Sequence, residues 1–235
     1  MRLMDSRPFF STQDSKLNTS NPREWGLYVV TDRSLTGGWP LEVVVDAACA
    51  GGAKAIQLRE KNLSTRDLYR LVERLLPLVH RQDACLLIND RVDLALALPV
   101  DGVHLSRRSL PPAETRALLG SARLIGVSCH SLEEAIEAEG DGADFIVFGP
   151  LFPTPSKVAY GPPVGLTQLS EVRRQVRLPI LGIGGITISN AASVMAAGAD
   201  GVAVITAVMT ADDPADAVSG LLQVVRSIAK STAEH

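Results

Sequence analysis

The chain has 235 residues, of which 46% are hydrophobic and 21% are charged, and its formal net charge is −3. This composition is ordinary for a globular protein, and it offers neither the basic surface nor the aromatic residues (4%) with which proteins bind nucleic acids. No apolar run approaches the roughly 18 residues of a membrane span. We therefore expect a cytoplasmic protein that binds neither nucleic acid nor membrane.

The first stretch of the chain, residues 1–24, is polar apart from one pair of phenylalanines and has no signal-peptide core. We interpret it as a disordered or loosely docked extension, and residues 231–235 as a short polar tail. Widely spaced cysteines with apolar neighbours predict buried, reduced thiols, as in cytosolic proteins. They are Cys49, Cys85 and Cys129.

From Trp25 onward, short apolar strands alternate with helices at spacings of about 20 to 30 residues. The strands are expected at 27–30, 53–58, 84–88, 102–105, 124–127, 145–148, 179–183 and 201–205. The helices are expected at 40–50, 65–81, 92–98, from 111 onward, and at 132–139, 166–175 and 216–228. This alternation predicts an α/β fold with a parallel sheet, and eight such units close naturally into a single (β/α)8 TIM barrel over residues 25–230.

An open, doubly wound sheet is the alternative fold. Such a sheet usually carries a glycine-rich fingerprint after its first strand. Here the sequence Thr31-Asp-Arg-Ser34 follows the first expected strand instead. The barrel is therefore the predicted fold.

Polar residues gather just after the C-terminal ends of six expected strands, and a barrel brings all these ends to one face. They are Arg59, Lys61, Asn89, Asp90, Ser128, His130, Thr154, Ser156, Lys157, Gly184, Gly185 and Thr206. Barrel enzymes place their active sites on this face, so we interpret the set as a site. The proline-rich segment that carries Thr154, Ser156 and Lys157 could by itself be an ordinary surface turn.

The charges in this set indicate its ligands. Arg59, Lys61 and Lys157 form a cationic group suited to a pyrophosphate. Asp90 could hold a Mg²⁺ that keeps most of its waters, or it could be a buried structural aspartate. Glu60 points the other way on an extended segment, so we expect it in a structural ion pair.

A second anion site is predicted after the seventh and eighth strands. Gly184 and Gly185 expose backbone amides next to an expected helix start, and Ile205-Thr206 follow the eighth strand. Together these two segments suit the binding of a phosphate monoester. The alternative is a glycine pair required by a tight turn. A diphosphate and a monophosphate on one face suggest a bimolecular transfer in which pyrophosphate is the leaving group.

The four histidines have different expected places. His104 lies within a strand, where a packed core histidine is the expectation. His130 follows the fifth strand and is the only histidine positioned for proton transfer. His80 and His235 are expected at the surface.

Eight motifs occur in one order along residues 25–230. They are Tyr28-Val-Val-Thr-Asp32, Gln57-Leu-Arg-Glu-Lys61, Ile88-Asn-Asp90, Gly102-Val-His-Leu105, Gly126-Val-Ser-Cys-His130, Gly149-Pro-Leu-Phe-Pro-Thr-Pro-Ser-Lys157, Ile183-Gly-Gly-Ile186 and Ala203-Val-Ile-Thr206. Together they resemble the thiamine phosphate synthase family, which includes the related thiazole tautomerases. The resemblance implies an enzyme that joins 4-amino-5-hydroxymethyl-2-methylpyrimidine diphosphate to a thiazole phosphate and releases pyrophosphate.

The resemblance also implies roles for individual residues. The pyrimidine diphosphate would be bound by Gln57, Arg59, Lys61, Asn89, Ser128 and Lys157. The thiazole phosphate would be held by Thr154, Ser156, Gly184, Gly185, Ile205 and Thr206. Asp90 would bind one Mg²⁺, and the catalytic residues would be Arg59, His130 and Lys157.

The sequence departs from the family in one segment. After the His-Leu of the fourth strand the family usually reads Gly-Gln-x-Asp, and the Asp is a second magnesium ligand; here the segment is Ser106-Arg107-Arg108-Ser109. Serine is a poor substitute for a carboxylate, and the arginines add positive charge beside the metal. The arginines could partly replace the metal's charge, Asp90 could hold Mg²⁺ with water and substrate alone, or the synthase reaction could be lost.

Two other functions are open. A thiazole tautomerase needs no diphosphate or metal, and its acid/base histidine would match His130. Against it, the diphosphate set is complete, so the synthase is favoured. A non-catalytic regulator that binds thiazole phosphate is the third hypothesis. Nothing in the sequence specifies an oligomeric state.

Overall fold

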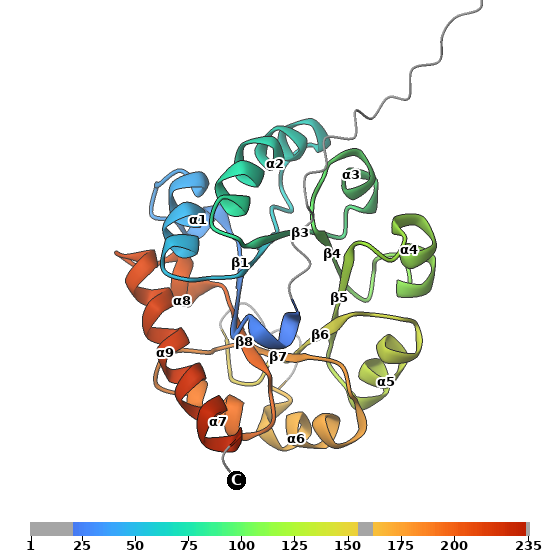
Figure 1. The fold of residues 1–235 in the computed structure, drawn as a ribbon, viewed down its shortest axis with the longest axis vertical. Coiled ribbons are helices and arrows are strands. Elements are labelled where there is room, and N and C mark those ends of the chain that lie inside the picture. Colours follow the sequence, from blue (N-terminus) through green and yellow to red (C-terminus); the bar gives the residue numbers. More distant parts are fainter. Residues whose placement is uncertain (1–20, 155–161, 234–235) are drawn as a thin grey trace, which may run out of the picture.

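The computed structural model describes residues 21–154 and 162–233 (Figure 1). Most of the expected N-terminal extension, the end of the tail, and both Ser156 and Lys157 lie outside the described residues. The first described element is a 3-10 helix, η1 (Pro22–Glu24). Its Arg23 guanidinium contacts the Asp200 carboxylate at 2.5 Å, which joins this end of the chain to the barrel.

Eight parallel strands form a closed barrel in which each strand pairs with its sequence neighbours and the last pairs with the first. They are β1 (Leu27–Val30), β2 (Ala55–Leu58), β3 (Cys85–Asn89), β4 (Gly102–Leu105), β5 (Leu124–Cys129), β6 (Phe145–Phe148), β7 (Ile180–Ile183) and β8 (Gly201–Val204). The predicted (β/α)8 barrel is therefore confirmed. β5 runs to Cys129, two residues beyond its expected end, because Ser128 and Cys129 continue the ladder against β6.

The helices form a ring outside the barrel (Figure 1). They are α1 (Leu41–Ala50), α2 (Thr65–His80), α3 (Val92–Ala97), α4 (Pro112–Leu119), α5 (Leu132–Gly140), α6 (Gly165–Gln175), α7 (Ala191–Ala196), α8 (Thr206–Met209) and α9 (Pro214–Ala233); a second 3-10 turn is η2 (Arg33–Leu35). The sequence predicted a helix start next to Gly184 and Gly185 but no bounds for α7, and it did not predict the short helix α8. In the part of the chain that the structure describes, none of the helices combines the length and apolarity of a membrane span.

The strands are short apolar runs because both of their faces are buried. Alternate residues of β1 belong to two separate packed clusters, with Leu27 and Val29 toward the helices and Tyr28 and Val30 inside the barrel. Trp25 stacks on Tyr28 at a centroid distance of 5.6 Å and closes the interior at the N-terminal end of β1. All three cysteines are buried and none forms a disulfide, as expected.

A repeated aspartate stands before each even-numbered strand from β4 onward. Asp101, Asp144 and Asp200 each accept a bond from the backbone N–H near the start of the preceding odd-numbered strand, at 2.7, 2.6 and 2.8 Å. Each carboxylate also contacts a basic side chain from an even-numbered helix. The basic residues are His80 of α2, Arg116 of α4 and Arg173 of α6, at 2.8, 2.5 and 3.0 Å.

His80 is therefore not the surface residue that we expected. Its Nε2 bonds to Asp101, which is fully buried, and its own side chain is only 22% exposed. The expectation failed because the partner lies 21 residues away in the sequence and is brought close only by the closure of the barrel.

Candidate active site

The structure brings the predicted site residues to one end of the barrel. Arg59 and Lys61 follow β2, Asp90 follows β3, His130 follows β5, and Thr154 lies in the loop after β6. The turn after β7 and the start of α8 after β8 supply the remaining described members, Gly184, Gly185, Ile205 and Thr206. Because all eight strands are parallel, these ends share one rim.

The end of β2 is fixed by a buried carboxylate. Glu60 is 8% exposed, accepts a bond from Thr31 Oγ1 at 2.7 Å, and forms an ion pair with Arg33 Nε at 3.6 Å. Thr31 Oγ1 in turn accepts the Arg59 backbone N–H at 3.0 Å. The expected structural ion pair of Glu60 is confirmed. Arg59 and Lys61 precede and follow this anchored carboxylate in the chain, and Lys61 lies in the turn that comes after β2.

Thr31 is a site-supporting residue that the sequence reasoning missed. Its buried hydroxyl connects the ends of β1 and β2 by donating to Glu60 and accepting from Arg59. Its position directly after an apolar strand is the same signal that identified the other residues of the rim.

Asp90 is the centre of a small network between the ends of β3 and β4. One carboxylate oxygen accepts from Ser109 Oγ and from the Ser106 backbone N–H at 3.2 Å; the other accepts from Asn89 Nδ2 at 2.8 Å. Burial raises the pKa of this carboxyl, but bonds from Ser109, Ser106 and Asn89 outweigh it and hold the pKa below its usual range. Asp90 is therefore ionised and half-buried, with φ of 61°.

The oxygen donors around Asp90 fit a weakly held Mg²⁺. One carboxylate and the hydroxyls of Ser106 and Ser109 are hard oxygen ligands, which suit this ion. Among the described residues, no cluster of three or more histidine, cysteine or acidic side chains could hold a metal by itself. The set therefore suits an ion coordinated mainly by water and by phosphate oxygens of a substrate.

His130 is exposed at the rim and held by two bonds. Its Nδ1 contacts the Gly149 carbonyl, and its backbone N–H donates to Glu134 Oε2 at 2.7 Å. A carbonyl only accepts, so Nδ1 carries the proton that is donated to Gly149. In the neutral ring Nε2 is then a lone-pair acceptor.

The loops after β6 and β7 lie against each other. Leu151 and Phe152 donate backbone bonds to the carbonyls of Ile183 and Gly184 at 2.8 and 3.1 Å. Gly184 and Gly185 have φ of 101° and 63°. A Cβ on Gly184 would lie 2.6 Å from the Cα of Pro150, and one on Gly185 would lie 2.8 Å from the Pro153 carbonyl oxygen.

The glycine pair therefore lets the loop that carries Thr154 approach the end of β7. The expected helix start is not adjacent to these glycines, because α7 begins only at Ala191, after a turn. Backbone amides of the turn itself, rather than of a helix, are available to a phosphate here.

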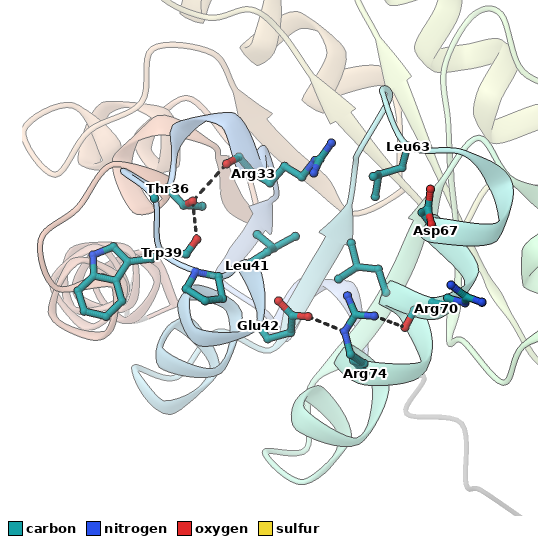
Figure 2. A pocket seen from close by; sticks show the side chains of 12 residues that line it. Arg33, Thr36, Trp39, Leu41, Glu42, Leu63, Asp67, Arg70 and Arg74 are labelled. Atoms are coloured by element: carbon teal, nitrogen blue, oxygen red, sulfur yellow. Dashed lines mark hydrogen bonds and ion pairs between the residues drawn. The ribbon is translucent and has the colours of Figure 1, made fainter.

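A separate cavity of about 470 Å³ lies beside the rim, between α1 and α2 (Figure 2). Trp39 and Leu63 contribute apolar surface, and Arg33, Arg70 and Arg74 bring positive charge. It contains none of the residues predicted for the site.

Comparison with known proteins gives one consistent result. A family model described as thiamine monophosphate synthase matches residues 27–208. The thiamine-phosphate synthase of Roseiflexus castenholzii is 51% identical over 198 residues, which are 84% of this chain and 87% of that protein. The thiamine-phosphate synthase of Moorella thermoacetica is 48% identical over 202 residues, 86% and 96% of the two chains. Among solved structures, the thiamine phosphate pyrophosphorylase from Pyrococcus furiosus is similar with a TM-score of 0.80 at 40% identity, covering 88% of this chain and 98% of that one.

Proposed function

The chain belongs to the thiamine monophosphate synthase family, and from this membership we propose how its barrel rim works as a thiamine-phosphate synthase. The reaction transfers a pyrimidinylmethyl group from its diphosphate to the nitrogen of thiazole phosphate, giving thiamine phosphate and pyrophosphate. The observation that carries the proposed arrangement is that Arg59, Lys61 and Asp90 follow β2 and β3, whereas the glycine turn after β7 packs against the loop after β6 elsewhere on the same rim.

The diphosphate half is built from the ends of β2, β3 and β5. Arg59 and Lys61 supply the positive charge, and Gln57, Asn89 and Ser128 supply polar contacts to the pyrimidine diphosphate. The fixed turn at Glu60 supports this assignment because it removes the acidic side chain from between the two cations. Lys157, outside the described residues, is proposed as a third cation.

The monophosphate half is built from the loops after β6, β7 and β8. Thr154, Gly185 and Thr206 are proposed to bind the thiazole phosphate, together with Gly184, Ile205 and Ser156, of which Ser156 lies outside the described residues. The close packing of the β6 and β7 loops supports this grouping because it holds hydroxyl and amide donors side by side.

The chemical step requires the departing diphosphate to be stabilised where its charge develops. Fixed cations perform this task without reorganising during the reaction, so Arg59 and Lys61 are proposed to lower the barrier to C–O cleavage. The pyrimidine methylene cation that results is captured by the thiazole nitrogen, which the monophosphate half holds in position.

Mg²⁺ is proposed as the cofactor, one ion held by Asp90, water and the diphosphate. It would neutralise charge on the leaving group. The ionised state of Asp90 and the oxygen-rich surroundings support this proposal.

A crossed pair of variants tests the two halves. Arg59→Met should raise the KM for the pyrimidine diphosphate roughly ten-fold or more, by loss of a charge-assisted bond, and leave the KM for thiazole phosphate unchanged. Gly185→Ala should raise the KM for thiazole phosphate and leave the KM for the pyrimidine diphosphate unchanged, because its Cβ displaces the loop after β6. Gly140→Ala is the control, since a Cβ there meets nothing within 4 Å. Equal effects on both substrates would contradict the division.

Thiazole tautomerase activity is the second candidate, and one observation favours it. The bond from His130 Nδ1 to Gly149 leaves Nε2 as a proton acceptor at the rim. If this activity exists, His130→Ala should abolish isomerisation of a carboxythiazole phosphate and leave thiamine phosphate formation largely intact. Isomerisation at the unchanged rate in His130→Ala would exclude the histidine from that role.

A further inference from the structure

His104 lies beneath the rim and connects the barrel interior to Ser128. It is 2% exposed, and its ring centroid lies 5.8 Å from those of Tyr28 and Phe145. Its Nε2 lies 2.9 Å from Ser128 Oγ, which is half-buried in β5. Gly126 is needed for this packing, because a Cβ there would lie 2.2 Å from Phe145 Cζ.

The direction of the hydrogen bond between His104 and Ser128 depends on which ring nitrogen carries a proton. A neutral imidazole has one N–H group, so one ring nitrogen donates and the other accepts. The surroundings of the two nitrogens therefore decide the direction of the bond.

The surroundings of Nδ1 favour a proton on Nε2. Among the described residues, His104 Nδ1 has no hydrogen-bond partner. A proton there would be a buried donor without an acceptor, which proteins tolerate less well than a buried acceptor without a donor. With the proton on Nε2, His104 donates to Ser128 Oγ and only a lone pair is left without a partner.

We propose that His104 is a positioning residue that makes Ser128 a hydrogen-bond donor to the bound pyrimidine. Because Ser128 Oγ accepts from His104, its own hydrogen is left for an acceptor on the substrate, such as a ring nitrogen. The inference rests on the proposed function, in which Ser128 contacts the pyrimidine diphosphate. The proposed bond also gives a basis for substrate specificity. A substrate with a lone pair at this position would be bound, and one with a C–H or N–H group there would be rejected.

The first test is equilibrium binding of pyrimidine diphosphate to the full chain by calorimetry. His104→Leu and Ser128→Ala should each weaken binding roughly three- to ten-fold, the value of one hydrogen bond, and the double variant should be no weaker than Ser128→Ala. His104→Gln, whose Nε2 can still donate to Ser128, should bind nearly as tightly as the unsubstituted protein. Tyr28→Phe is the matched control, because it alters a ring beside the same imidazole without touching the bond.

The second test reads the tautomer directly. Nitrogen-15 NMR of the free, full-length protein should show a protonated Nε2 and an unprotonated Nδ1 for His104. A proton on Nδ1, or additive losses in the double variant, would overturn the proposal. The NMR result does not depend on turnover. If the protein is inactive but shows the expected tautomer, the proposed function is wrong and the His104–Ser128 bond is still established.

Discussion

Asp90 lies where the ends of β3 and β4 meet, and Ser109 has a double effect on it. The serine hydroxyl binds one carboxylate oxygen and helps to keep the carboxyl ionised, yet it takes the place where the family has a second carboxylate. A metal held there depends on the substrate for most of its ligands. The Mg²⁺ affinity of this rim is therefore expected to be weak without diphosphate.

Ser109→Asp should strengthen Mg²⁺ binding. A second carboxylate beside Asp90 adds a charged oxygen ligand, so the Mg²⁺ concentration for half-maximal rate should fall, roughly ten-fold for one additional ligand. The Mg²⁺ concentration for half-maximal rate is measured by recording the initial rate at increasing Mg²⁺ concentrations. Ser109→Ala is the control that removes the hydroxyl without adding charge. An unchanged Mg²⁺ requirement would mean that the missing carboxylate does not limit the reaction.

The His80–Asp101 pair should make stability depend on pH. The bond to Asp101 raises the pKa of His80, with burial opposing, so the folded state binds this proton more tightly than the unfolded state. The stabilisation is complete below the unfolded pKa of about 6.5 and disappears as pH rises through the folded pKa. Asp101 and Arg123 are the charged groups that face the site.

Urea unfolding at about pH 5.5 and about pH 8.5 measures this effect. The free energy of unfolding should exceed that of His80→Gln by about 1–2 kcal/mol at the lower pH, and the difference should shrink at the higher pH. A difference that grows with pH would contradict the assigned direction of the pKa shift.

At the scale of the elements, the repeated aspartates connect alternate helices to the N-terminal end of the barrel. Each carboxylate accepts a bond from a strand N–H and contacts a basic side chain at the helix immediately before that strand, so it fixes the register between strand and helix. The position before β2 breaks the pattern: Lys54 stands there, and its Nζ donates to the Gln82 carbonyl at 3.0 Å. The N-terminal end of the barrel is thus stabilised by one buried carboxylate, Asp101, and two partly exposed ones, Asp144 and Asp200.

Asp200→Ala should destabilise the protein by about 2–4 kcal/mol, because it leaves the Ile180 N–H and the Arg173 guanidinium without this acceptor. Chemical denaturation measures the change. Asp212→Ala, at an exposed site, is the control and should have almost no effect. A loss below about 1 kcal/mol would mean that other groups replace the carboxylate.

At the scale of the whole molecule, barrel closure separates a packed interior from a polar rim. The three cysteines are buried, Cys85 inside the barrel and Cys49 and Cys129 between the strands and the helices, and burial raises the pKa of Cys49 and Cys129 to about 12. They should react with Ellman's reagent only after unfolding. Rapid labelling of native protein would show that the core opens more easily than its packing indicates.

The fold could be predicted from the sequence because every strand is a short apolar run, a pattern that indicates burial on both faces, and helical spacing recurs between the strands. Element ends were less accurate, since Ser128 and Cys129 are held in β5 by ladder bonds that polarity does not reveal. The role of His80 and the network around Asp90 depend on residues distant in sequence. Such contacts exist only once the barrel has closed.

Formation of thiamine phosphate from its two phosphorylated precursors is the most direct measurement. With purified full-length protein, pyrimidine diphosphate and thiazole phosphate, we expect thiamine phosphate and pyrophosphate to appear in equal amounts. The rate should rise with Mg²⁺ and fall sharply in Asp90→Asn. No thiamine phosphate at any Mg²⁺ concentration would contradict the synthase assignment.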